Sequence, residues 1–262
     1  MKNYNFNFYL SLKYILIAVI FLVYSCSSVA PDLTQPPAPK MIPYSGSPFI
    51  DSGIRPYPDA EGVGAIIIEW NNSLKLKETS IKKDFGGYYL YRSSEVDSNG
   101  VPFKFVKIRI LIAASGEVDS IVIDPEVDIE KTFFYFVKGF SKIDNSNEGP
   151  SSDTVNFTLV KKPILQFPKG EVTDSVSTFT FNNISGGEVS IQVYEVDHDE
   201  KNIPLDTLWQ EKFSIPLSNS IQKIGYNGKR LINGRTYKWR LDKTFGNNPR
   251  AASSKWSIFN YK

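Results

Sequence analysis

From about residue 48 onward, the chain alternates short apolar runs with clusters of turn residues. The runs are rich in β-branched and aromatic side chains, and Gly, Asn, Asp and Pro separate them. None of this region keeps the 3.6-residue period of an amphipathic helix, whereas the two-residue period of a half-buried strand recurs. The pattern therefore predicts an all-β protein built of antiparallel β-sandwiches. The predicted strands are 64–70, 88–92, 103–110, 120–123, 132–140, 154–160, 177–181, 189–196, 208–213, 236–241 and 256–259.

A basic, proline-containing segment divides these strands into two series. It reads KKPILQFP and covers residues 161–168. The series before it spans about 110 residues and the series after it about 100, and each is the usual size of one sandwich domain. We therefore expect two β domains, at residues 48–160 and 161–262.

The two series share a motif near their ends. Ile129 stands six residues before Tyr135, and Leu231 stands six residues before Tyr237. In both places, side chains that alternate between two faces follow the tyrosine. In sandwich folds this spacing builds a tyrosine corner, in which the phenol hydrogen-bonds to nearby backbone.

These motifs resemble those of the fibronectin type III family. In the first half, Trp70 stands on strand B, residues 87–93 on strand C and Tyr135 at the corner of strand F. The second half resembles the family less closely, because Phe181 stands where the strand-B tryptophan is expected. The resemblance implies two tandem immunoglobulin-like, fibronectin type III-like sandwiches of seven strands each. It implies no activity, because this fold carries many functions.

The N-terminus has the layout of a secretory signal. Lys2 and Lys13 supply positive charge, and residues 14–23 form an uncharged apolar core. This core is too short to span a bilayer, which requires about 20 apolar residues. We predict that residues 1–25 are a signal peptide; the alternative is a signal that is uncleaved or cleaved elsewhere.

The end of this signal resembles the lipobox of bacterial lipoproteins. In that family, a peptidase cuts before a cysteine that has already been lipidated. Val23 and Ser25 fit the pattern, whereas Tyr24 is larger than the small residue usual at its place. The resemblance implies that Cys26 carries a lipid, which would attach the chain to a membrane of the bacterial cell envelope. We expect that membrane to be the outer one, with its periplasmic or surface face left open.

Proline is concentrated in the residues that follow Cys26. Residues 27–48 hold six prolines and few large apolar side chains. Because proline-rich segments are stiff and extended, residues 26–47 are predicted to form a tether that holds the folded part away from the bilayer.

Charge and cysteine content narrow the possible functions. Loss of residues 1–25 would remove two lysines and no acidic residue, which leaves 28 basic and 28 acidic side chains. A net charge of zero gives no electrostatic case for binding nucleic acid. Cys26 is the only cysteine, so the predicted domains contain no disulfide and no thiolate metal site.

No arrangement of residues favours catalysis. The only histidine, His198, lies in a polar stretch predicted to be a solvated loop, and no G-x-S-x-G motif presents a serine. The segment DNSNEG at 144–149 begins like a calcium loop, but Val155 replaces the twelfth-position glutamate. It is predicted to be a polar turn. We therefore expect neither an enzyme nor a bound cofactor or metal.

Strand C carries the best candidate for a binding surface. Tyr88, Tyr89 and Tyr91 cannot all face one core, because successive side chains on a strand alternate between faces. At least one should lie on an outer face, where it could contact a partner or a sugar ring. The candidate surface comprises Tyr88, Tyr89, Tyr91, Asp144, Asn145 and Asn147.

The sequence thus predicts a non-catalytic, lipid-anchored envelope protein that acts as a protein-binding or scaffold module. Its expected partners are the membrane, through Cys26, and another envelope or surface protein. The alternative is a surface lipoprotein that binds glycans through exposed aromatic side chains.

Overall fold

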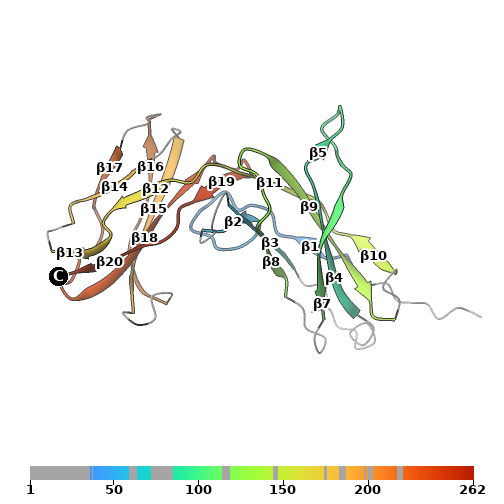
Figure 1. Ribbon diagram of the computed structural model, residues 1–262, viewed down its shortest axis with the longest axis horizontal. Coiled ribbons are helices and arrows are strands. Elements are labelled where there is room, and N and C mark those ends of the chain that lie inside the picture. Colours follow the sequence, from blue (N-terminus) through green and yellow to red (C-terminus); the bar gives the residue numbers. More distant parts are fainter. Residues whose placement is uncertain are drawn as a thin grey trace, which may run out of the picture. The chain divides into compact units, whose positions relative to one another are not determined.

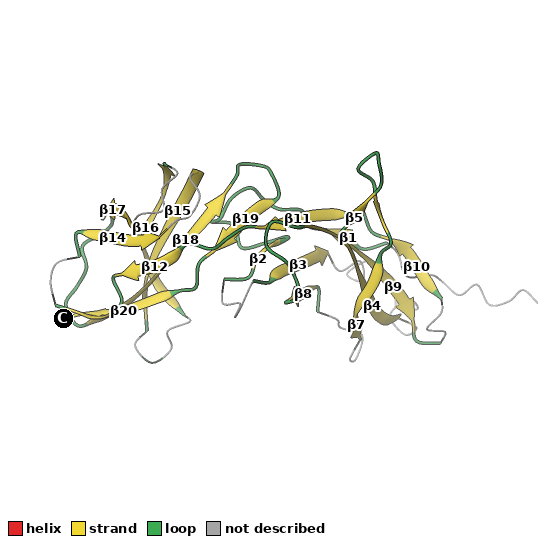
Figure 2. Ribbon diagram, turned by 45° about the horizontal axis from the view of Figure 1, so that its top comes forward, coloured by secondary structure: helices red, strands yellow, loops and turns green. Residues whose placement is uncertain are grey.

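In the part of the chain that the structure describes, the regular elements are all β-strands. The computed structural model describes residues 36, 38–58, 64–71, 85–113, 119–143, 147–173, 176–182, 187–197, 199, 203–216 and 221–262. Figure 1 labels the strands, and Figure 2 shows strands and loops without a helix in these residues. The predicted all-β fold class is confirmed. The predicted signal peptide and Cys26 lie outside the described residues.

Two sheets pack face to face in the first half of the chain. The strands of the smaller sheet pair antiparallel around β3, which has β1 and β2 on one edge and β8 on the other. The larger sheet runs in the order β7-β4-β9-β11, with β10 also paired to β9. A short hairpin, β5–β6, lies between β4 and β7 in the chain. The bounds are β1 Lys40–Met41, β2 Arg55–Pro56, β3 Ile66–Asn71, β4 Phe85–Ser93, β5 Glu95–Val96, β6 Pro102–Phe103, β7 Val106–Ile112, β8 Ile121–Asp124, β9 Thr132–Ser141, β10 Glu148–Ser151 and β11 Val155–Leu159.

The second half repeats this arrangement. Its smaller sheet runs β12-β14-β17, and its larger sheet places β15 between β16 and β18, with β20 and β13 beyond β18. β13 joins β20 in parallel, so the chain crosses from one sheet to the other between β12 and β13. The bounds are β12 Ile164–Phe167, β13 Gly170–Val172, β14 Thr178–Asn182, β15 Gly187–Val196, β16 Pro204–Ile215, β17 Ile221–Gly225, β18 Arg235–Thr244, β19 Arg250–Ser253 and β20 Ser257–Tyr261.

Each pair of sheets encloses its own hydrophobic core. Trp70, Tyr135 and Phe157 lie in the first core and are at most 1% exposed. Phe181 and Trp239 lie in the second core and are fully buried. Phe181 thus occupies a core position on β14, while the central tryptophan of the second core comes from β18. The two predicted sandwiches are present, each with its own core.

A parallel strand pair connects the larger sheets of the two sandwiches. β19 pairs with β18 in the second sandwich and, in parallel, with β11 of the first. Ala251 on β19 also belongs to the first core, where it is 2% exposed. Residues 35–262 therefore form one compact unit with two cores.

The first sandwich begins earlier than the predicted boundary at residue 48. Met41 pairs with Trp70 in the β1–β3 ladder and is 1% exposed in the core. Pro36 is also buried, and its side chain lies against Gly139. The last part of the proline-rich segment is therefore integrated into the sandwich, because its apolar residues complete the first core.

The two predicted tyrosine corners differ in the partner of the phenol. The hydroxyl oxygen of Tyr237 accepts a hydrogen bond from the backbone N–H of Ile232 at 2.7 Å, as the prediction required. The Tyr135 hydroxyl instead donates to the Asp124 carboxylate at 2.9 Å. The second corner is confirmed, whereas the first uses a side chain in place of backbone.

Candidate functional site

The outer face of the β7–β4–β9 sheet carries two of the three candidate tyrosines, all of which lie on β4. Tyr88 and Leu90 point into the core and are fully buried, so Tyr89 and Tyr91 point away from it. Cross-strand partners share a face: Ile110 and Lys138 flank Tyr89, whereas Lys107 and Phe136 flank Tyr91. We call this surface the outer tyrosine face. It comprises Tyr89, Tyr91, Lys107, Ile110, Ile112, Phe136, Lys138, Phe140 and Glu148.

Tyr88 does not belong to the surface for which it was a candidate. Its ring packs edge-on against Trp70 at 5.5 Å and against Phe85 at 5.0 Å between centroids. Tyr88 is therefore a core residue. The alternation of the strand leaves Tyr89 and Tyr91 as the outward pair.

Tyr89 is largely covered by neighbouring side chains. Its ring stacks on Phe140 at 4.2 Å with an interplanar angle of 12°. The Lys107 ammonium lies 3.3 Å from the Tyr89 ring centroid, a close cation–π contact. Only 5% of Tyr89 is exposed. Its ring thus supports the face and offers little open surface for stacking on a sugar.

Tyr91 is half-buried and tied to its neighbours. Its ring stacks on Phe136 at 4.7 Å, and its hydroxyl donates a 2.6 Å hydrogen bond to Glu148. Burial, followed by the hydrogen bond and charge of Glu148, raises the pKa of the Tyr91 phenol well above its ordinary value. The phenol is therefore a fixed hydrogen-bond donor at neutral pH.

Glu148 on β10 organises the charges of the outer tyrosine face. Its carboxylate accepts hydrogen bonds from Tyr91 and Lys107, and the Lys138 ammonium lies 3.2 Å away. Burial alone would raise its pKa, but the hydrogen bonds from Tyr91, Lys107 and Lys138 outweigh burial and lower it. The three strands β4, β7 and β9 are thereby linked to β10 by one carboxylate. Sequence reasoning missed this residue, because its partners lie far away along the chain.

Strand β7 forms the open edge of this face. Among the described residues it pairs only with β4. Ile110 and Ile112 share the face of Tyr89 and are 56% and 76% exposed. Two outward isoleucines beside an edge that no described strand pairs with are unusual for a surface in contact with water alone.

Of the three candidate residues in the predicted turn, only Asn147 lies in the described part of the chain. Asp144 and Asn145 lie outside the described residues, as does His198. Asn147 is half-buried, and its carbonyl oxygen accepts a 3.4 Å hydrogen bond from the Ser141 N–H. Within the described ranges, no group of three or more His, Cys, Asp or Glu side chains is placed to hold a metal ion.

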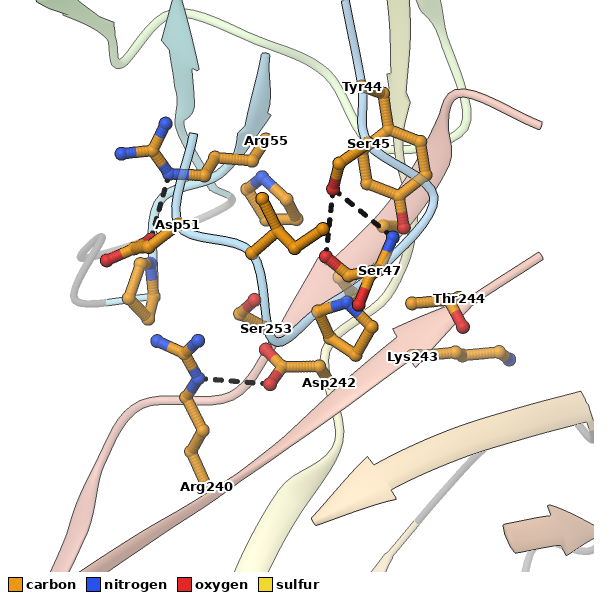
Figure 3. A pocket seen from close by; sticks show the side chains of 16 residues that line it. Tyr44, Ser45, Ser47, Asp51, Arg55, Arg240, Asp242, Lys243, Thr244 and Ser253 are labelled. Atoms are coloured by element: carbon orange, nitrogen blue, oxygen red, sulfur yellow. Dashed lines mark hydrogen bonds and ion pairs between the residues drawn. The ribbon is translucent and has the colours of Figure 1, made fainter. Parts of the chain in front are cut away.

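A second cluster of polar residues lies where the loop after β1 meets β18 and β19 (Figure 3). Asp242 is 2% exposed, and its carboxylate accepts hydrogen bonds from Arg240 at 3.0 Å and Gln192 at 2.6 Å. Gln192 also donates to the carbonyl of Pro48 at 2.9 Å, which ties the loop to the second sandwich. Burial raises the pKa of Asp242, while Arg240 opposes that shift.

The cavity in this cluster is too small for a substrate. It holds about 30 Å³, room for roughly one water molecule. The Tyr44 hydroxyl and the Asp242 Oδ1 atom are buried there without a hydrogen-bond partner. The cluster is therefore a structural contact between the loop and the second sandwich, and sequence reasoning did not detect it.

Comparison with known proteins does not identify a family for this chain. No family model matches the chain, and no curated protein matches it. Among solved structures, a crystal structure of the FN1–FN3 domains of chicken CNTN1 is similar at 13% identity with a TM-score of 0.29. The match covers 86% of this chain and 66% of that one. So weak a likeness is no evidence of a shared function.

No helix in the described residues is long and apolar enough to cross a membrane.

Proposed function

We propose that this chain is a non-catalytic, lipid-anchored envelope protein that binds another protein through the outer tyrosine face and the free edge of β7. The observation that carries the proposal is the exposure of Ile110 and Ile112 on an edge strand, at 56% and 76%. An open edge presents unpaired backbone groups, and a partner strand can pair with them.

The neighbouring side chains suit a protein partner. Two stacked aromatic pairs form a rigid floor beside the isoleucines: Tyr89 on Phe140, and Tyr91 on Phe136. Lys107 and Lys138 add positive charge at the rim, partly neutralised by Glu148. A partner strand with apolar side chains toward Ile110 and Ile112 would complete the sheet.

Site-specific crosslinking in cells tests the binding face. A photoreactive residue at Ile112 should capture one defined partner, and the same residue at Lys223, exposed on β17 of the second sandwich, should not. Binding of that purified partner should then fall at least tenfold in the Ile110→Lys, Ile112→Lys double variant, because two lysines replace the apolar contact. Identical crosslinks at both positions, or unchanged affinity of the double variant, would contradict the proposal.

The lipid anchor rests on the Val23–Cys26 pattern of the sequence. It is tested by growing bacteria that express the full-length chain with a labelled fatty acid. Label should enter the parent protein and not the Cys26→Ser variant. Equal labelling of both proteins would show that the lipid is not on this cysteine.

A further inference from the structure

A groove of about 650 Å³ opens on the second sandwich, away from the outer tyrosine face. One side is formed by residues 162–165 of the basic, proline-containing segment, which include the start of β12, and by residues 169 and 170, where β13 begins. The other side is formed by residues 254–258, which lead from β19 into β20. The groove thus gives a structural role to a segment whose sequence marked only a boundary between domains.

Two hydrogen bonds hold the turn beside the groove in place. The carbonyl oxygen of Pro168 accepts from the indole N–H of Trp239 at 2.8 Å and from the Ser257 hydroxyl at 3.1 Å. Trp239 is fully buried. The turn between β12 and β13 is therefore held against both the core and β20, so the groove is preformed.

Trp256, on the other side of the groove, is also held in place. Lys238 and Arg240 on β18 both lie over its ring, at 4.9 and 4.6 Å from the centroid. Its ring also contacts Tyr194, with 5.7 Å between centroids. These cation–π contacts fix the side chain, and Trp256 remains partly exposed.

The lining combines apolar walls with charge of one sign. Ile164, Leu165 and Trp256 are among the apolar lining residues. All the charged side chains in the lining are lysines, namely Lys162, Lys169 and Lys255. Lys169 and Lys255 are exposed, one on each side of the groove. The groove therefore attracts negative charge and accommodates apolar surface.

We propose that this groove binds a small amphipathic anion, a molecule with one carboxylate or similar anionic group on an apolar body. Ligand sites are typically concave, between about 300 and 1,000 Å³, and mostly apolar with a few placed polar groups. The apolar body lies against Ile164, Leu165 and Trp256, and the anionic group lies toward the lysines. This proposal is independent of the protein-binding face on the first sandwich.

Calorimetric titration of the full-length protein with decanoate tests the proposal. Decyltrimethylammonium has the same chain length and the opposite charge, so it serves as the matched ligand control. We expect saturable 1:1 binding of decanoate and at least tenfold weaker binding of the cation, because the exposed Lys169 and Lys255 flank the groove.

Variants assign the binding to the groove. Lys169→Ala and Lys255→Ala should each weaken decanoate about two- to fivefold, the range for one exposed charge pair. Ile164→Asp should weaken it at least tenfold, because it places a carboxylate in the apolar wall. Lys223→Ala removes an exposed lysine outside the groove and should leave binding unchanged. Circular dichroism of every variant confirms that it is folded.

Three results would overturn the proposal. They are equal binding of decanoate and the cation, equal binding by the lysine variants and the parent, and no saturable binding at all. None of them bears on crosslinking at Ile112, so the two proposals fail separately.

Discussion

Asp124 links the two sheets of the first sandwich. It lies on β8 in the smaller sheet, 3% exposed, and accepts hydrogen bonds from Arg92 on β4 and Tyr135 on β9 in the larger sheet. The Glu126 N–H is a further donor at 3.1 Å. Burial, followed by the charge and hydrogen bond of Asp124, raises the pKa of Tyr135. A buried carboxylate is stable only with such partners.

Removal of the Arg92 side chain should therefore destabilise the first sandwich. We expect Arg92→Met to lower the free energy of unfolding by roughly 3 kcal/mol, since it leaves a buried carboxylate without its cation. Urea unfolding measures the change. The matched control is Lys104→Met, which removes the cation of the exposed Lys104–Glu95 pair and should cost less than about 1 kcal/mol. Equal losses in the two variants would contradict this account.

Glu148 should make stability depend on pH. Its pKa in the folded state is lowered from 4.5, so the ionised form stabilises the fold above the unfolded value. That contribution is lost as the pH falls through the lowered folded pKa. The parent should therefore be more stable than Glu148→Gln at pH 7, and the difference should shrink below pH of about 4. A difference that is constant between pH 7 and pH 3 in urea unfolding would refute this.

At the scale of single residues, the sequence predicted which face of the strand a side chain takes better than it predicted which residues that side chain contacts. The alternation on strand C required that Tyr88 and Tyr89 face opposite sides, and they do. The partners of Tyr91 could not be predicted, because Glu148 reaches it only through the pairing of β10 with β9. Contacts between distant strands depend on register, which single-sequence patterns do not specify.

Among the elements, long β-branched and aromatic runs were predicted well, whereas several short strands were missed. The runs that became β3, β9 and β15 have strong alternation or continuous apolar side chains. β12 lies between two prolines, and only two of the five residues of β17 are apolar, so neither shows a strand pattern. Such strands form because neighbours pair with them, which is tertiary context.

Strand β4 illustrates a constraint that composition does not reveal. Gly87 has a φ of +140° and pairs with Ile112 at the end of β7. A Cβ atom there would lie 1.8 Å from the carbonyl oxygen of Leu111. The close approach of β4 and β7 therefore requires glycine.

Gly87→Ala should loosen the edge of the outer tyrosine face. We expect a loss of roughly 3 kcal/mol in stability, because the strand must either move or adopt a strained backbone. The rate of hydrogen exchange of the β7 amides should rise as the stability falls. Gly100→Ala, where φ is +78° and no atom lies within 4 Å, should cost only about 1 kcal/mol. Unchanged exchange in β7 would show that the sheet tolerates the added methyl group.

For the whole molecule, the two cores depend on each other through β19. Ala251 belongs by sequence to the second sandwich but packs in the first core. Two repeated domains could be predicted from the motifs, whereas this shared strand could not, because "RAAS" has no strand signal of its own.

A change on β19 should accordingly disturb the first sandwich. We expect Ala251→Leu to destabilise it by about 1–3 kcal/mol through overpacking. The readout is faster hydrogen exchange in β9 and β11, while exposed Lys223→Leu on β17 should leave those strands unchanged. Faster exchange confined to the second sandwich would contradict the shared core.

The β11–β19 pair also determines what happens when the halves are separated. The Val160 N–H donates to the Ala251 carbonyl at 3.0 Å, and the Thr158 N–H donates to Pro249 at 2.8 Å. A fragment that ends at residue 160 loses these acceptors and bares a second unpaired edge on β11. We expect such a fragment to self-associate, although it retains every residue of the first core except Ala251. Sedimentation measures this self-association. A monomeric, fully folded fragment would show that β11 does not need to pair with β19.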